Sequence, residues 1–199
     1  MPGKVGHDNR VKLEFAGANP RVSIDGVDRL QAESNYLLGK DVSKYLRHVP
    51  NYSDVRYEDL YPGIRLDFYG NGQQLEHDFT VAPGASPATI VFHFEGAKST
   101  EIGSSGDLVV RMDEGDLRLK KPYAYQTIGK GRRPVEVSFA PNHDGRIGFH
   151  VGSYDRTQPL TIDPVFVFST YLDGSNQDNV AAVQHPSRHR SAKRARSTD

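Results

Sequence analysis

The sequence of 199 residues contains no cysteine. That absence excludes disulfide scaffolds, thiolate zinc sites and cysteine nucleophiles in one step. It assigns no redox compartment, because a chain without cysteine is compatible with reducing and oxidising surroundings alike. The length suits one domain or two small ones.

The sequence also lacks long apolar runs and an excess of charge of either sign. No stretch of 18 apolar residues occurs, so no membrane insertion is expected. The first ten residues have no apolar core, so no signal peptide is expected in this chain. Lysine plus arginine and aspartate plus glutamate number 25 each. This balance argues against a generally basic surface, and no nucleic-acid partner is expected.

Motifs of common catalytic sites are missing as well. The sequence has no G-x-S-x-G, no P-loop, no HExxH and no HxH. His77 lies on the apolar face of an expected strand, where a hydrogen-bonded core histidine is commoner than a ligand or a base. The oxygen-rich residues 173–179 do not have the spacing of an EF-hand. We therefore expect no catalytic, cofactor-binding or metal-binding residue, and a chain that is not an enzyme.

What the sequence does contain is alternation of apolar and polar residues with a period of two. Such runs recur about every 8 to 15 residues between residues 64 and 168, separated by glycine and proline turns. Residues 70–72, 113–115 and 142–145 predict hairpin turns. The pattern predicts an all-β fold, an antiparallel β-sandwich-like domain.

One stretch has helical spacing instead. Val42, Tyr45, Leu46 and Val49 follow the i, i+3, i+4, i+7 pattern, and Pro50 would end a helix there. This spacing predicts one short helix of about two turns, covering an end or an edge of the sheet.

The C-terminus differs in composition from the rest of the chain. Residues 185–199 contain five lysines and arginines, one acid and no large apolar residue. Such a segment cannot bury enough surface to offset its ordering entropy, so a disordered basic tail is expected. Residues 1–10 are expected to form a flexible N-terminus, and residues 11–168 the sandwich-like domain.

Tyrosine is concentrated between Tyr36 and Tyr69, where six of the ten tyrosines lie. Clustered aromatic rings stack on sugars or anchor a partner, or they cap the ends of a sandwich with the ring buried. The cluster supports a carbohydrate-binding module as an alternative function, which requires three or more coplanar, exposed rings. The candidate contact residues for a ligand or partner are Tyr52, Tyr57, Tyr61 and Tyr69.

Glu76 and Asp78 are two residues apart on one expected strand and therefore share a face. Two carboxylates about 5–9 Å apart can perform acid/base chemistry on a glycosidic bond. Solvated faces of strands carry charges routinely, however. A glycoside-processing enzyme is therefore the weaker alternative, and it requires a cleft around this pair.

Several longer motifs occur in a fixed order along residues 11–180, and over this range the chain resembles a known family. The motifs that carry the resemblance include Leu60-Tyr61-Pro62-Gly63-Ile64, Val81-Ala82-Pro83-Gly84-Ala85, Lys121-Pro122 with Tyr125-Gln126, Val151-Gly152-Ser153-Tyr154-Asp155, and Ile162-Asp163-Pro164. The family that the chain resembles is the N-terminal β-rich domain of large bacterial surface proteins with SBBP-type β-propeller repeats.

The resemblance implies an extracellular or cell-surface location and a domain without established enzymatic activity. Partners would be other surface proteins or glycans. Residues 169–184 resemble an incomplete first propeller repeat, which cannot bury its face alone. The chain is therefore expected to be a fragment, a truncated or frame-shifted reading of a longer gene. The expected function is that of a non-catalytic structural or interaction module.

Overall fold

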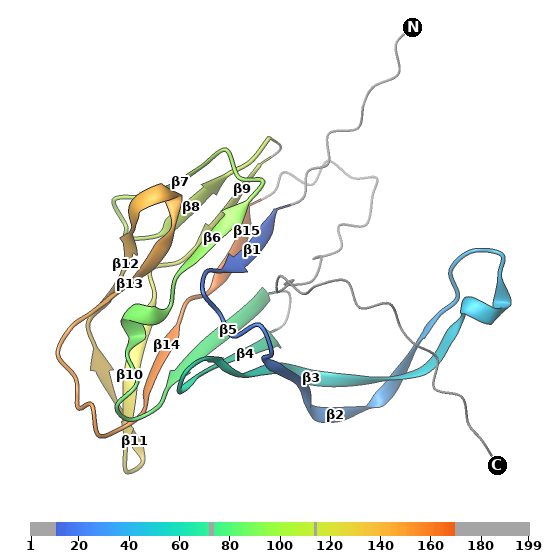
Figure 1. Cartoon of the computed structure of the whole chain (residues 1–199), viewed down its shortest axis with the longest axis horizontal. Coiled ribbons are helices and arrows are strands. Elements are labelled where there is room, and N and C mark those ends of the chain that lie inside the picture. The colour runs from blue at the N-terminus through green and yellow to red at the C-terminus, as the bar shows by residue number, and fades with distance from the viewer. Residues whose placement is uncertain (1–10, 72–73, 114, 170–199) are drawn as a thin grey trace, which may run out of the picture.

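The structure is a computed structural model that describes residues 11–71, 74–113 and 115–169, and these residues form mainly β-strands (Figure 1). The expectations for residues 1–10 and 170–199, including the oxygen-rich segment and the basic tail, concern residues outside these ranges. The strands are β1 (Lys12–Phe15), β2 (Ser23–Tyr36), β3 (Leu46–Tyr61), β4 (Ile64–Asn71), β5 (Gln74–Val81), β6 (Phe92–Glu95), β7 (Ser99–Ile102), β8 (Leu108–Arg111), β9 (Asp116–Leu119), β10 (Tyr123–Ile128), β11 (Gly131–Val135), β12 (Val137–Pro141), β13 (Ile147–Val151), β14 (Leu160–Asp163) and β15 (Phe166–Ser169), with 3-10 turns η1 (Val42–Lys44), η2 (Pro87–Thr89) and η3 (His143–Gly145).

The strands form three sheets. The largest has seven strands in the order β11-β10-β14-β5-β4-β3-β2, and two four-stranded sheets have the orders β1-β6-β13-β12 and β15-β9-β8-β7. The pairs between named strands of the described residues are all antiparallel. The predicted all-β, antiparallel, sandwich-like fold is therefore confirmed.

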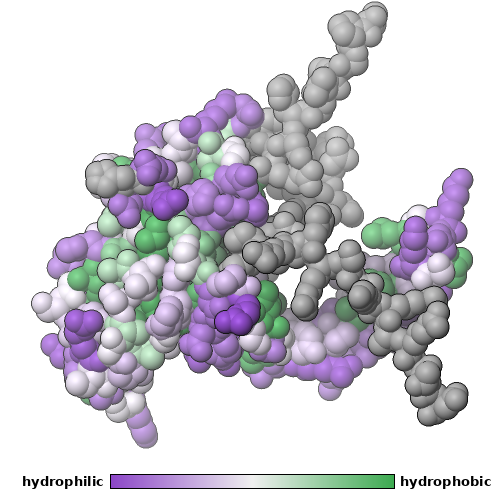
Figure 2. Space-filling model, viewed as in Figure 1, coloured by the Kyte–Doolittle hydropathy of each residue, from purple (hydrophilic) through white to green (hydrophobic). Residues whose placement is uncertain are grey.

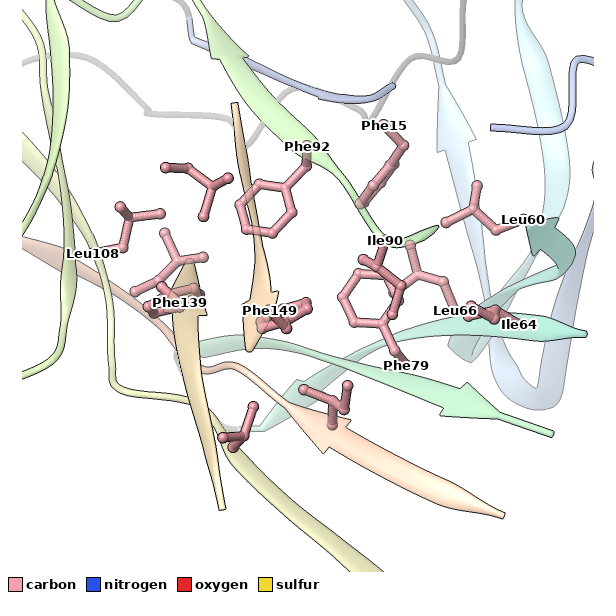
Figure 3. Packing of buried hydrophobic residues seen from close by; sticks show 14 of the residues in the cluster. Phe15, Leu60, Ile64, Leu66, Phe79, Ile90, Phe92, Leu108, Phe139 and Phe149 are labelled. Atoms are coloured by element: carbon pink, nitrogen blue, oxygen red, sulfur yellow. The ribbon is translucent and has the colours of Figure 1, made fainter. Parts of the chain in front are cut away.

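Aromatic side chains fill the space between the seven-stranded sheet and the β1 sheet (Figure 3). Phe79 of β5 has no exposed surface, and its ring lies 5.9 Å from Phe15 of β1 and 5.7 Å from Phe149 of β13. Phe92 of β6 packs 5.8 Å from the same Phe149 ring. The alternating apolar residues of strands from both sheets thus meet in one core, as the period of two requires.

The hairpins predicted from turn residues are present. Asn71 pairs with Gln74 across the β4–β5 turn, and Arg111 pairs with Asp116 across the β8–β9 turn. Gly115 in the second turn has φ of +89°, a conformation that favours glycine. The strands β12 and β13 pair on either side of the turn at residues 142–146.

The predicted two-turn helix over residues 42–49 is wrong. Only Val42–Lys44 form a 3-10 turn, and β3 begins at Leu46. The residues of η1 are all exposed, so no apolar helix face is buried, and a short helix without such packing is not stable. The apolar residues of this stretch lie in a β-hairpin instead.

That hairpin is the most unusual part of the architecture. Strand β3 pairs with β4 only from Asp54 onward, whereas β2 and β3 remain paired with each other as far as Tyr36 and Leu46. Residues 28–53 therefore form a two-stranded projection, which extends away from the sandwich at the right of Figure 1. We call residues 28–53 the arm.

Candidate functional site

Two of the four candidate contact tyrosines are core residues, so the prediction that they contact a ligand or partner is corrected here. Tyr57 and Tyr61 are 6% and 3% exposed. The Tyr61 hydroxyl donates hydrogen bonds to the carbonyl oxygens of Val91, at 2.9 Å, and Ala16, at 3.1 Å, which ties β3 to the ends of β6 and β1 in the other sheet. Burial raises the pKa of Tyr61 to about 12.

The other two tyrosines lie in different surroundings. Tyr69 is half-buried on β4, and its hydroxyl donates a hydrogen bond of 3.2 Å to Asp78. Tyr52 is 40% exposed on the arm, and its ring covers Gly26, where a Cβ atom would lie only 2.4 Å from the ring. Of the six tyrosines from Tyr36 to Tyr69, only Tyr36 and Tyr52 are exposed. These rings do not assemble the platform of three exposed rings that the carbohydrate alternative requires.

Glu76 and Asp78 do share the face of β5 that points away from Phe79, as predicted from their spacing. The register adds two further carboxylates to this face. Asp67 of β4 is paired directly with Asp78. On the other side, Phe79 pairs with Ile162 and Glu76 bridges Val165, which places Asp163 of β14 opposite Asp78. We call Asp67, Asp78 and Asp163 the carboxylate row.

Among the described residues, the carboxylate row forms ion pairs at one end only. Arg56 and Arg65 both form ion pairs with Asp67, with Arg65 Nε 2.8 Å from the carboxylate. No lysine or arginine of the described residues forms an ion pair with Asp78 or Asp163, and one buried Asp163 oxygen has no hydrogen-bond partner there. Burial, followed by the charge of Asp163, raises the pKa of Asp78 to about 6. Burial also raises the pKa of Asp163.

Asp67 is thus buried, and Asp78 and Asp163 are half-buried, contrary to the ordinary expectation for the outer face of a sheet. The structure has a shallow hollow of about 280 Å³, but its lining residues belong to the segments around η2 and β13 and include none from β4, β5 or β14. The described residues contain no group of three or more histidine, aspartate or glutamate side chains able to hold a metal ion. The row is therefore best explained as a set of interacting charges within the sheet.

The arm is the other feature on which function can depend. Its internal contacts are polar: Arg29 and His48 both lie 3.0 Å from the Glu33 carboxylate, and Ser34 donates a 2.9 Å hydrogen bond to Asn51. Most of its large apolar side chains are exposed, and Figure 2 shows apolar surface at its far end. Seven of the twelve large hydrophobic residues that are exposed in the described structure lie on the arm: Leu30, Tyr36, Leu37, Leu38, Val42, Leu46 and Tyr52.

The motifs that carried the resemblance meet one another inside the fold. Gln126 of β10 is 1% exposed, and its amide nitrogen donates a 2.8 Å hydrogen bond to the carbonyl of Asp155, while its oxygen accepts one of 3.0 Å from the Asp155 amide. The Gly63 carbonyl accepts a 2.9 Å bond from Ala82. These motif residues therefore position loops and turns of the framework.

Comparison with known protein families finds one match. The family described as domain of unknown function (DUF7948) matches residues 4–165. This chain belongs to that family. No curated protein and no solved structure matches the chain. The matched range includes the arm, the carboxylate row and the Gln126 contacts, so all three lie within the DUF7948 domain.

The described part of the DUF7948 domain contains no helix that is long and apolar enough to cross a membrane. Sequence reasoning identified neither the arm nor Asp67 and Asp163, the two carboxylates that join Asp78 in the row. The arm had a signal in Tyr36-Leu37-Leu38, an apolar run that lacks the period of two seen in the buried strands. Asp163 had no such signal in the sequence, because only the pairing of β5 with β14 brings it beside Asp78.

The carboxylate row of the DUF7948 domain leads to a testable prediction on stability. We expect Asp78→Asn to raise the free energy of unfolding at pH 7 by about 1–2 kcal/mol, after allowance for solvent screening. The native pKa of Asp78 is raised, so its ionisation above about pH 6 destabilises the fold, and an asparagine removes that charge. The amide oxygen can still accept the Tyr69 hydrogen bond.

Urea unfolding at pH 7 and at pH 5 measures this effect. The increase in the free energy of unfolding caused by Asp78→Asn should be smaller at pH 5, where Asp78 is already largely protonated. Glu58→Gln, at an exposed position of β3, is the matched control and should lack this pH dependence. A gain of equal size at both pH values would contradict the charge argument.

Proposed function

We propose that this DUF7948 domain is a non-catalytic interaction module of an exported bacterial surface protein, and that the arm is its contact surface. The observation that carries the proposal is the concentration of exposed hydrophobic side chains on the arm. An exposed apolar patch of this kind marks an interaction site in a soluble domain. A hairpin without a third strand is also only marginally stable in water, so contact with a partner stabilises it.

The location rests on the resemblance to domains that precede SBBP-type propeller repeats. In that setting, the sandwich is a rigid head or spacer, and the arm reaches another surface protein. The absence of recognisable catalytic motifs in the sequence is consistent with this role. Leu38 is 77% exposed, and burial of large apolar side chains such as this one is sufficient to stabilise a contact with a partner.

A carbohydrate-binding module is the second candidate function. Tyr36 and Tyr52 are exposed and lie on the same arm, so stacking on a sugar would use these two rings. Titration with oligosaccharides while protein fluorescence is recorded tests this role. Binding that is lost in Tyr36→Ala and Tyr52→Ala would favour it over the protein-contact proposal.

The contact surface is tested by photo-crosslinking in cells that produce the protein. A photoreactive residue in place of Leu38 should give a discrete protein adduct. The same residue in place of Ile128, which is 54% exposed on β10 and outside the arm, should not. Absence of any discrete adduct from Leu38, or equal adducts from both positions, would overturn the proposal.

A further inference from the structure

The arm exposes enough apolar surface for a complete interface. Its seven large hydrophobic residues are between 40% and 77% exposed. Summed over all faces of the arm, they present roughly 800 Å² of surface, and a standard interface takes about 800 Å² from each partner. The arm therefore carries most of the exposed large hydrophobic residues in the described structure that could form such a contact.

Charge is distributed unequally along the arm. The end that joins the sandwich carries Asp28 and Glu33 against Arg29, an excess of one acid. The far end carries an excess of base, from Lys40, Lys44 and Arg47 against Asp41. Over residues 28–53 as a whole the two signs nearly balance, with four lysines and arginines and three acids.

The charge distribution of one arm is complementary to that of a second arm that runs in the opposite direction. If two arms lie side by side and antiparallel, the basic end of each meets the acidic end of the other. The arrangement is isologous, so it closes as a two-fold dimer and leaves no further surface to propagate.

The opposite edge of the seven-stranded sheet does not compete for this role. Strand β11 carries Arg132, Arg133 and Pro134, all exposed. Charged side chains and proline on an edge strand oppose pairing with another chain. Association through this sheet is therefore directed to the end that bears the arm.

We propose that the arm docks, antiparallel, on the arm of a second copy of this chain and forms a two-fold dimer. This inference rests on the proposed function, because it names the partner of the same surface. In the dimer, the apolar residues from Leu30 to Leu46 of one arm pack against those of the other. The acidic and basic ends form the outer parts of the interface.

The oligomeric state of the purified chain tests the dimer. Sedimentation and light scattering over a range of micromolar concentrations should show a monomer–dimer equilibrium. Leu38→Asp should raise the dissociation constant at least tenfold, because it places a charge in an apolar contact. Ile128→Asp, at a similarly exposed position outside the arm, should leave the constant unchanged. A monomer at every concentration, or a dimer insensitive to Leu38→Asp, would overturn the inference.

Disulfide crosslinking tests the antiparallel arrangement, because the chain contains no native cysteine that could form competing disulfides. Leu38→Cys lies at the far end of the arm and Leu30→Cys near its base. Mixing the two variants under mild oxidation should give mainly the mixed disulfide-linked dimer. Predominant Leu38→Cys homodimers would instead show contact between the two far ends and would contradict the proposed arrangement.

The crosslinking and solution experiments separate failure of this inference from failure of the proposed function. If the purified chain is monomeric and the photoreactive residue at position 38 captures a different protein, the second-copy inference is wrong and the interaction module stands. If position 38 gives no adduct at all, both are wrong. An adduct with twice the mass of the chain supports both.

Discussion

Replacing Phe79 with alanine is expected to lower the free energy of unfolding by about 3–5 kcal/mol. Phe79 has no exposed surface and lies at the centre of the seven-stranded sheet on β5. Its ring contacts Phe15, His77 and Phe149, which come from three different strands and two sheets. Truncation would leave a cavity that this rigid cluster of rings cannot close. Urea unfolding monitored by circular dichroism measures the loss.

The matched control is Ile128→Ala, at an exposed position of the same sheet, which should change stability by less than about 0.5 kcal/mol. A loss below about 1 kcal/mol for Phe79→Ala would contradict the register of β5. A one-residue slip would place Asp78 in the core and Phe79 outside. The experiment therefore tests the strand faces as well as the packing.

The alternation of apolar and polar residues predicted which face of each buried strand points into the core. Ile64, Leu66 and Phe79 alternate with charged residues, and a period of two has only one interpretation once one face must be buried. The turns were predictable because glycine at positions such as 115 adopts a backbone conformation that other residues avoid. Both signals are local and need no knowledge of distant contacts.

Where the prediction was wrong or incomplete, the deciding contact was distant in sequence. The spacing of Val42 and Leu46 suits a helix, but no surface is available to bury one side of it, and the hairpin forms instead. Tyr57 and Tyr61 were candidate surface residues, yet they pack into the core through neighbours that the sequence does not reveal. The carboxylate row likewise depends on the pairing of β5 with β14.

His77 is a buried residue whose pKa should make the fold sensitive to acid. It is 3% exposed, and its ring lies 5.4 Å from Phe68 and 4.6 Å from Phe166. Burial was expected, but the hydrogen bond was not found: Nδ1 has no partner within the described residues. Loss of hydration without a compensating charge lowers the pKa of His77 to about 3.

The sign of the effect follows from proton binding. The unfolded chain binds a proton at His77 near pH 6.5, whereas the folded chain does so only near pH 3. Stability contributed by the neutral histidine is therefore lost as the pH falls through this interval, by about 1.4 kcal/mol for each pH unit. Between pH 6 and pH 4 this amounts to roughly 3 kcal/mol.

Asp78, the next residue along β5, opposes this loss in the same pH interval. Its native pKa is raised to about 6, so its protonation stabilises the fold as the pH falls. In the unmodified protein the Asp78 contribution therefore offsets part of the His77 contribution. We therefore expect His77→Leu to make stability increase from pH 6 to pH 4 relative to the unmodified protein, and Asp78→Asn to make it decrease.

Urea unfolding of these two variants and of their double variant at a series of pH values separates the contributions. The double variant should have a pH profile between those of the two single variants, because the two titrations act in opposite directions and both are removed. His77→Leu should not destabilise the fold at neutral pH, since the histidine makes no hydrogen bond through Nδ1 that leucine would forfeit. If His77→Leu leaves the pH profile unchanged, the histidine is not buried in its neutral form. The opposite effects of His77 and Asp78 would then not explain how the stability of the domain responds to acid.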